Sequence, residues 1–309
     1  MRDLISISDI GREGIERLLD RASTFSGVAE REIQKVPALR GRLIVNLFYE
    51  ASTRTTSSFE LAAKRLSADV ISVRSSGSSV EKGESLKDTI ATLDAYEPAA
   101  IVVRHPRAGA ANLVSRWTQA SVINAGDGAR AHPTQALLDV HTLRNRFGSL
   151  EGLSIWIVGD IAHSRVARST AAAFRLMGAE VTLAGPPTLL PPGIGAALGC
   201  DVRYDLVGMD KADVIYSLRM QHERMVGGDV PSLREYTKLY GIGLDRLMPH
   251  QLVMHPGPVN RGVELSGEVV DSPQCLMTEQ VSAGVAVRMA VLYELLAGER
   301  SQRLVEAAA

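Results

Sequence analysis

The segment Ser52-Thr53-Arg54-Thr55 is the part of this sequence whose residue types point most directly to chemistry. It follows the apolar stretch Leu43–Phe48 and opens a pattern in which apolar residues recur at helical spacing from Phe59 to Leu66. A strand that leads into a helix directs free backbone N–H groups outward at the positive end of the helix dipole, where anions bind. Hydroxyl groups and a guanidinium add further donors. The segment therefore predicts a site for a phosphorylated small molecule, although Ser52 and Thr53 could also serve only as helix caps.

Polar and cationic residues follow the other predicted strands as well, where open α/β sheets bind their ligands. In order they are Lys82 in the loop 74–84, Arg104-His105-Pro106, Asn124–Gly128 with His132 and Gln135, Gly159-Asp160 with His163 to Arg165, Arg219 with Gln221, and His255-Pro256-Gly257-Pro258. Each alone could be a surface arginine, a solvated lysine, a helix cap or a simple turn. The turn at His255-Pro256 could contain a cis peptide. Together they favour a crevice with phosphate donors on one side and arginines for carboxylates on the other.

The elements that must position these residues alternate between strand and helix along the whole chain. Predicted strands lie at 43–48, 70–73, 100–103, 122–124, 153–159, 181–184, 202–204, 214–218 and 252–254, and predicted helices at 10–31, 85–95, 109–117, 133–147 and 278–297. This βαβ rhythm predicts the α/β class with parallel sheets covered on both faces. The 309 residues suffice for two such doubly wound domains, and the last helix is apolar on nearly all sides, as a buried helix would be.

Composition excludes several classes of protein. Hydrophobic residues make up 45%, charged residues 22%, and the net charge is −1, so nothing global indicates a nucleic acid or a membrane surface. Cys200 and Cys275 fit no zinc pattern or disulfide framework and are expected to be reduced. No apolar run approaches about 18 residues, and the N-terminus lacks a signal sequence. We therefore expect a cytoplasmic protein.

Several common catalytic motifs are missing from the sequence. It contains no GxGxxG after a strand, no GxxxxGK[ST], no GxSxG elbow and no carboxylate cluster that suggests a metal. We therefore expect no cofactor and no metal. The chemistry should be a direct group transfer, driven by positioning and electrostatic stabilisation.

The stretch Phe48–Thr55, followed by Ser58-Phe59-Glu60, resembles the carbamoyl phosphate signature of the aspartate and ornithine carbamoyltransferase family. Further motifs, spread in the right order over nearly the whole chain, resemble the aspartate branch: Lys82–Ser85, Asn124–Gly128, His132–Gln135, Arg219–Arg224 and His255–Pro258. The resemblance implies a carbamoyl phosphate-binding domain at 1–134, completed by a returning C-terminal helix at 278–309, and an aspartate-binding domain at 135–277. It also implies a homotrimer whose active sites are shared between neighbouring chains.

The resemblance assigns roles to individual residues by position. Ser52, Thr53, Arg54 and Thr55 would hold the phosphate. Ser78 and Lys82 would reach into the neighbouring subunit's site, Ser78 to carbamoyl phosphate and Lys82 to both substrates. Arg104, His132 and Thr55 would polarise the carbamoyl oxygen, and Gln135 would hold the carbamoyl nitrogen. Arg165, Arg219 and Gln221 would bind the aspartate carboxylates, while Pro256 and Gly257 would offer backbone carbonyls. The chain departs from the family pattern at Ala51, Thr56 and Gly257, which puts side-chain packing there in question but not the backbone roles.

The activity that the resemblance implies is carbamoyl transfer from carbamoyl phosphate to L-aspartate, the second step of de novo pyrimidine synthesis. Transfer to ornithine is an alternative, opposed by the two arginines on the acceptor side and by the absence of a cysteine in His255–Pro258. A non-catalytic scaffold homologue is another, opposed by the presence of every phosphate-site residue. A regulatory chain or a dihydroorotase stays open as a partner, and phosphate itself is a candidate acceptor for the amine proton.

Overall fold

The computed structural model describes residues 1–74, 83–221 and 232–297, which form two compact units. Unit 1 comprises Met1–His141 together with the chain from Ser282 onward, and unit 2 comprises Thr142–Val281. Both divisions fall inside helices, the first in α5 (Pro133–Phe147) and the second in α10 (Met277–Leu296). Each unit has its own parallel sheet, so the α/β class expected from the sequence is confirmed.

The sheet of unit 1 has four strands in the order β2-β1-β3-β4. The strands are β1 (Leu43–Phe48), β2 (Asp69–Arg74), β3 (Ala100–His105) and β4 (Ser121–Asp127). Four strands were expected in these places, and three of them are longer than expected. Strands β3 and β4 are almost wholly buried, whereas β2 at the edge has only exposed and partly buried residues. The register places Phe48 beside Arg104, so the ends of β1 and β3 meet at one edge of the sheet.

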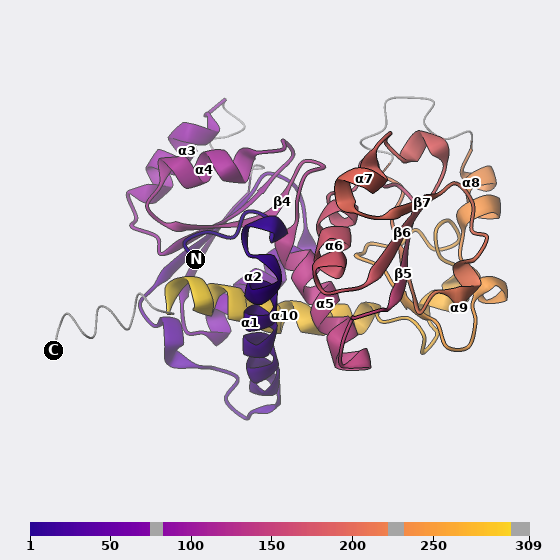
Figure 1. Ribbon diagram of the computed structural model, residues 1–309. Helices are drawn as coiled ribbons and strands as arrows, with labels where there is room; N and C mark the ends of the chain where they lie inside the picture. Colours follow the sequence, from indigo (N-terminus) through magenta and orange to yellow (C-terminus); the bar gives the residue numbers. More distant parts are fainter. Residues whose placement is uncertain (75–82, 222–231, 298–309) are drawn as a thin grey trace. The chain divides into compact units, whose positions relative to one another are not determined.

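Helices cover both faces of this sheet (Figure 1). In Figure 1, α3 (Leu86–Asp94) and α4 (Ala110–Trp117) lie on one side, and α1 (Gly11–Ser26), α2 (Thr53–Arg65) and α10 lie on the other. Alternate residues of β1, Val45 and Leu47, share a buried cluster with Ile90 of α3 and Val114 of α4, as the period of two along a strand requires. Helix α1 is shorter than expected, because a 3-10 turn at Gly27–Glu30 follows it.

Helix α10 is surrounded by protein over its C-terminal part. Residues 286–292 are all buried, including the guanidinium-bearing Arg288. The expectation of a buried last helix is therefore confirmed for this part. It is wrong for the first turns, because the side chain of Val281 is 53% exposed.

The sheet of unit 2 has five parallel strands in the order β7-β6-β5-β8-β9. They are β5 (Ser154–Val158), β6 (Glu180–Ala184), β7 (Asp201–Arg203), β8 (Val214–Ser217) and β9 (Leu252–Met254), with α6 (Arg165–Leu176), α7 (Ile194–Leu198), α8 (Leu233–Tyr240) and α9 (Gly267–Val270) between or after them. Its core joins Trp156 and Val158 of β5 to Ile215 of β8 and Tyr236 of α8. Helices α7 and α9 are too short for a helical period to be read from sequence.

Both cysteines of unit 2 are free thiols. Burial raises the pKa of the Cys200 thiol to about 11 and also raises the pKa of Cys275. Among the described residues, no helix combines the length and the apolar character that crossing a membrane requires.

Candidate active site

The N-terminus of α2 holds the segment that the sequence singled out. Ser52 is the residue before the helix, and its side chain makes no capping hydrogen bond. Helical bonding begins with the Thr56 N–H, which donates to the Ser52 carbonyl at 3.0 Å, so the N–H groups of Thr53, Arg54 and Thr55 precede it. The first turn contains no acidic residue. Capping by Ser52, the ordinary alternative, is therefore not found, and this helix end suits an anion.

Other helices of the chain show what a serine cap looks like when it is formed. Helices α3, α6, α8 and α9 each begin after a serine whose hydroxyl accepts a backbone N–H three residues further on, namely Ser85 from Asp88, Ser164 from Ala167, Ser232 from Glu235 and Ser266 from Val269. Helix α2 has the same residue type in the same position without that bond. Within the described residues, no hydrogen bond or ion pair engages the Arg54 guanidinium, which is exposed.

Arg104, near the end of β3, is held beside this helix end. The Tyr49 N–H donates to the Arg104 carbonyl at 2.8 Å, which ties the ends of β1 and β3 together. The Arg104 Nη1 donates to the Ala125 carbonyl at 3.1 Å, and its Nε lies 3.5 Å from the Glu50 carboxylate. These contacts orient the guanidinium before any ligand arrives, which reduces the entropy that a ligand contact must offset.

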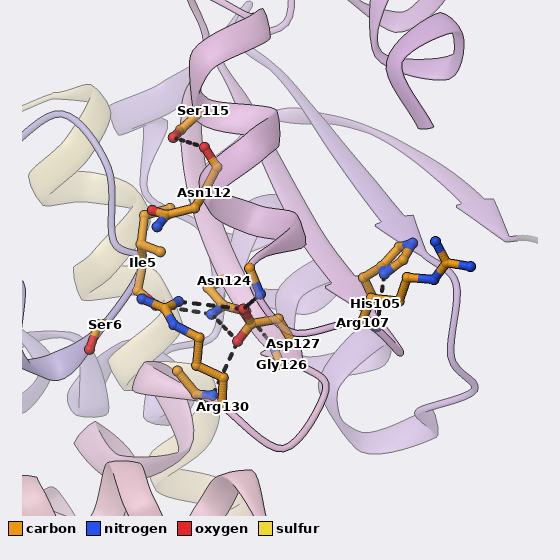
Figure 2. A network of polar contacts seen from close by, with 12 residues as sticks. Ile5, Ser6, His105, Arg107, Asn112, Ser115, Asn124, Gly126, Asp127 and Arg130 are labelled. Atoms are coloured by element: carbon orange, nitrogen blue, oxygen red, sulfur yellow. Dashed lines mark hydrogen bonds and ion pairs between the residues drawn. The ribbon is translucent and has the colours of Figure 1, made fainter. Parts of the chain in front are cut away.

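The buried carboxylate of Asp127 organises the loop between β4 and α5 (Figure 2). One oxygen accepts from Asn124 Nδ2 at 2.9 Å and from the Ala131 N–H at 3.1 Å. The other accepts from the Gly109 N–H at 2.7 Å and lies 3.4 Å from the Arg130 guanidinium. These contacts fix the loop immediately before His132. All of these contacts are made by the carboxylate of Asp127. The carboxylate needs them in turn, because a buried carboxylate is stable only when it is paired or hydrogen-bonded.

The loop leads into the buried side chains of His132 and Gln135 at the start of α5. The His132 carbonyl accepts the Ala136 N–H at 3.3 Å, which begins the helix. Gln135 donates its amide N–H to the carboxylate of Asp139 at 2.9 Å, one turn further along. A glycine is required at position 128, since its φ is +50° and a Cβ would lie 2.5 Å from the backbone nitrogen of Ala108.

Unit 2, like unit 1, has a buried aspartate at the end of a strand. Asp160, which follows β5, is fully buried and accepts the His163 N–H at 3.1 Å on one oxygen. Its other oxygen accepts the Gln221 N–H at 3.2 Å, which ties the segment after β8 to the end of β5. Arg165, the first residue of α6, is buried, and Arg219 is half-buried.

Arg168 braces the loop that carries these residues. Its guanidinium donates to the carbonyls of Ile161 at 3.2 Å, Ala162 at 3.0 Å and Ser164 at 3.1 Å. Burial lowers its pKa, and the charge of Asp160 opposes that shift. Arg168 therefore hydrogen-bonds three backbone carbonyls of the loop. Arg165 directly follows Ser164, the serine that caps α6.

The turn after β9 is held by a buried histidine. His255 Nδ1 accepts the Gly257 N–H at 2.8 Å, and its Nε2 lies 3.4 Å from the buried Glu264 carboxylate. The peptide bond between Gly257 and Pro258 is cis, and the cis peptide that the turn alternative allowed at His255-Pro256 is not found. Gly257 has φ +65°, a conformation that favours glycine over the leucine usual in the family pattern. The departure at Gly257 therefore suits its backbone.

Comparison with known sequences accounts for nearly the whole chain. The profile described as the carbamoyl-P binding domain of aspartate/ornithine carbamoyltransferases matches residues 2–145. The profile of their Asp/Orn binding domain matches residues 151–295. This chain belongs to the aspartate/ornithine carbamoyltransferase family. The resemblance inferred from the motifs is thereby confirmed.

Relatives on the aspartate side of the family align over their full length. The aspartate carbamoyltransferase catalytic subunit of Salinispora arenicola is 55% identical over 304 residues, which cover 96% of this chain and 99% of the relative. That of Pelotomaculum thermopropionicum is 55% identical, with coverage of 96% and 97%. Among solved structures, aspartate transcarbamoylase from Trypanosoma cruzi in complex with carbamoyl aspartate and phosphate is 32% identical with a TM-score of 0.86, each chain covered to 96%. The catalytic subunit from M. Jannaschii is 37% identical with a TM-score of 0.84, with coverage of 97% and 99%.

The structure distributes the family's predicted site residues between the two units. Unit 1 holds Ser52, Thr53, Arg54, Thr55, Arg104, His132 and Gln135, and unit 2 holds Arg165, Arg219, Gln221, Pro256 and Gly257. Ser78 and Lys82 lie outside the described residues. In unit 1 the strand pairing and the Arg104–Ala125 contact bring the first group to one edge of the sheet. In unit 2, Asp160 links the segments of Arg165 and Gln221.

Sequence reasoning placed Asp127 and Asp160 in strand-end segments but gave them no role, and it did not name Arg168 at all. Asp127, Asp160 and Arg168 were not among the predicted site residues, nor was Glu50. A signal was present in two of them, since Asp127 ends a strand and Asp160 follows one, each beside a glycine. An aspartate at such a position can accept the backbone N–H groups of the following loop.

Proposed function

We propose that this chain transfers the carbamoyl group of carbamoyl phosphate to the amine of L-aspartate, giving N-carbamoyl-L-aspartate and phosphate. The observation that carries the proposal is the open N-terminus of α2, where Ser52 leaves the first turn uncapped and Arg54 is exposed. Full-length relatives named aspartate carbamoyltransferase catalytic subunit support the choice of acceptor. The reaction would be the second step of pyrimidine synthesis, in the cytoplasm.

Unit 1 would act as the carbamoyl phosphate-binding domain. Ser52–Thr55 would hold the phosphate through hydroxyl groups, backbone N–H groups and the Arg54 guanidinium. Arg104, Thr55 and His132 would meet the carbamoyl oxygen, where negative charge grows in the transition state. Gln135 would accept the carbamoyl N–H. The preset orientation of Arg104 supports this role, because donors that need no rearrangement stabilise a transition state best.

Unit 2 would act as the aspartate-binding domain. Arg165, Arg219 and Gln221 would bind the two carboxylates, for which the planar guanidinium is well suited. The carbonyls of Pro256 and Gly257 would face the reacting amine. The fixed turn between His255 and Gly257 supports that backbone role, since it holds the carbonyl-bearing residues in one conformation.

The bonds change in a simple order. The neutral amine of aspartate attacks the carbamoyl carbon, the carbonyl oxygen takes up negative charge, and the C–O bond to phosphate then breaks. The proton lost by the amine nitrogen passes to the departing phosphate. The phosphate leaves among cationic and N–H donors that stabilise its charge. Loss of one donor to the developing oxyanion typically lowers turnover by about 10²–10³-fold.

We further propose a homotrimer in which Ser78 and Lys82 act in the neighbouring subunit's site. Lys82→Ala mixed with Arg54→Ala should then regain activity, because some mixed trimers contain an intact site. Sedimentation of the purified chain should give three times the mass of one chain. No recovery on mixing, or a monomer that is fully active, would contradict the shared site.

The direct test is formation of carbamoyl-aspartate by the purified chain. Carbamoyl phosphate is offered with L-aspartate and, in parallel, with L-ornithine, without added metal. Turnover with aspartate alone is expected. Turnover with ornithine would mean that the acceptor side has been misassigned, and a folded chain inactive with both would favour the scaffold alternative.

A further inference from the structure

The turn after β9 carries two backbone carbonyls, those of Pro256 and Gly257, that could serve a ligand. Both residues are half-buried. Among the residues that the structure describes, no N–H or O–H group donates to either carbonyl. A carbonyl oxygen has two lone pairs, so these carbonyls can accept N–H groups from a bound molecule. Which atoms of that molecule they meet depends on the direction in which each peptide plane is held.

The ring of His255 fixes the plane of the peptide between Pro256 and Gly257. The Gly257 N–H donates to His255 Nδ1 at 2.8 Å. This peptide is trans, and in a trans peptide the N–H and the C=O point in opposite directions. The Pro256 carbonyl is therefore directed away from the ring. Without the hydrogen bond the peptide plane could turn, and the carbonyl would lose its single direction.

His255 is itself held in place, and its neighbours set the position of its ring proton. Its backbone N–H donates to the side-chain oxygen of Gln280 in α10 at 3.1 Å. Its Nε2 lies 3.4 Å from Oε1 of Glu264, and both side chains are fully buried. The same carboxylate oxygen accepts the Asn260 N–H at 2.6 Å, which holds the carboxylate. Because a carboxylate only accepts, it favours the tautomer with the proton on Nε2, which leaves Nδ1 free to accept from Gly257.

We propose that His255, with its tautomer set by Glu264, is a positioning residue that directs the Pro256 carbonyl at the reacting amine of aspartate. The inference rests on the function proposed above and deepens it. An amine whose N–H is accepted by a fixed carbonyl has its lone pair held in one direction, as attack on the carbamoyl carbon requires. The turn therefore governs recognition of the amine, separately from the carboxylates assigned to Arg165 and Arg219.

Two substitutions of His255 separate positioning from packing. An asparagine side-chain oxygen can accept the N–H of the residue two positions further on, which is the bond that His255 makes to Gly257. Leucine fills the site without an acceptor. We expect the KM for L-aspartate to rise about tenfold in His255→Leu, as for loss of one hydrogen bond, and to stay within about threefold of the native value in His255→Asn. A residue that only filled the core would give the opposite order, since leucine suits an apolar site better than asparagine does.

Succinate is the probe that separates the amine from the carboxylates, because it has both carboxylates of aspartate and no amine. Its inhibition constant, measured against aspartate, should stay within about twofold of the native value in both variants. Equal rises of the aspartate KM and the succinate constant in His255→Leu would overturn the proposal, because they would show a general disturbance of the site. A His255→Asn variant as impaired with aspartate as His255→Leu would overturn it as well.

His250 of the same unit is exposed and provides the matched control, because His250→Leu should change neither constant. Circular dichroism and thermal melting verify that each variant folds. Nitrogen-15 NMR of the histidine rings tests the tautomer in the native chain, whether or not a variant folds. We expect the proton of His255 on Nε2, and a proton on Nδ1 would overturn the proposal. A native chain that forms no carbamoyl-aspartate would instead refute the proposed function, whatever the tautomer of His255.

Discussion

The first turns of α2 in unit 1 and α6 in unit 2 begin alike and differ in one hydrogen bond. Each helix follows a serine after a strand of a parallel sheet, and each has an arginine in its first turn. The Ser164 hydroxyl accepts the Ala167 N–H at 3.1 Å, whereas the Ser52 hydroxyl caps nothing. Helix α6 has thus satisfied part of its own N-terminus, whereas the N-terminus of α2 has no side-chain cap.

The difference indicates two ways of holding an anion. Unit 1 can use the backbone of a helix end, which suits the three oxygens of a phosphate. For unit 2 we propose side chains instead, since the Ser164 hydroxyl already accepts an N–H group at the end of its helix α6. Guanidinium groups match the flat shape of a carboxylate. Both units share one supporting device, a buried aspartate that fixes the loop: Asp127 in unit 1 and Asp160 in unit 2.

The largest effect should come from Arg54→Ala, which removes the exposed guanidinium from the open helix end. Turnover should fall by about 10²–10³-fold, because the leaving phosphate loses a charged donor. Circular dichroism and melting should not change. Arg12→Ala, an exposed arginine paired with Glu16 at the start of α1, serves as the control and should keep full activity. Turnover of Arg54→Ala close to native would refute the phosphate role of α2.

Substitution of the two buried aspartates, Asp127 and Asp160, should affect the KM values of the two substrates differently. Asp160→Asn places an NH₂ group against an N–H donor, and we expect the KM for aspartate to rise about tenfold, as for loss of one hydrogen bond. Inhibition by inorganic phosphate should be unchanged. Asp127→Asn should do the reverse, weakening carbamoyl phosphate more than aspartate. If either substitution raised the KM values of both substrates equally, the two aspartates would not act separately on the two substrate sites.

The serines test the difference between the helix ends directly. Ser164→Ala should lower the free energy of unfolding by about 1 kcal/mol through loss of the cap, with little effect on the KM for carbamoyl phosphate. Ser52→Ala should leave stability unchanged, because no cap is lost, and raise that KM a few-fold, as for loss of one neutral donor. Urea unfolding and steady-state kinetics measure the pair. Equal losses of stability in both variants would mean that Ser52 is a cap after all.

The smallest effect concerns His105, at the end of β3 in unit 1. Burial lowers its pKa below the usual 6.5, and its Nδ1 accepts the Arg107 N–H at 3.0 Å. The folded chain thus binds fewer protons at His105 than the unfolded chain does, so stability should fall slightly as the pH drops below about 6.5. The urea midpoint of His105→Gln should vary less with pH between 5 and 7 than that of the native chain. Identical pH profiles would contradict the shift.

Local patterns predicted most of the architecture. Strand β9 and helix α5 begin and end where the sequence indicated, and every strand of both sheets was anticipated. These features depend on apolar spacing and on turn residues next to one another in the chain. Short helices such as α7, and the exposure of Val281, escaped prediction because neither leaves a periodic pattern.

The sequence by itself determined the parallel α/β class, the family, and the types of residue at each strand end, since all of these rest on neighbours along the chain. Only the tertiary structure decided that Ser52 leaves its helix open while Ser164 closes its own. It also decided that the buried guanidinium of Arg288 lies over the ring of Phe59, which is far from it in the sequence. The physical reason is the same in both cases: whether a polar group is satisfied depends on which distant segments surround it, and burial sets how much that matters.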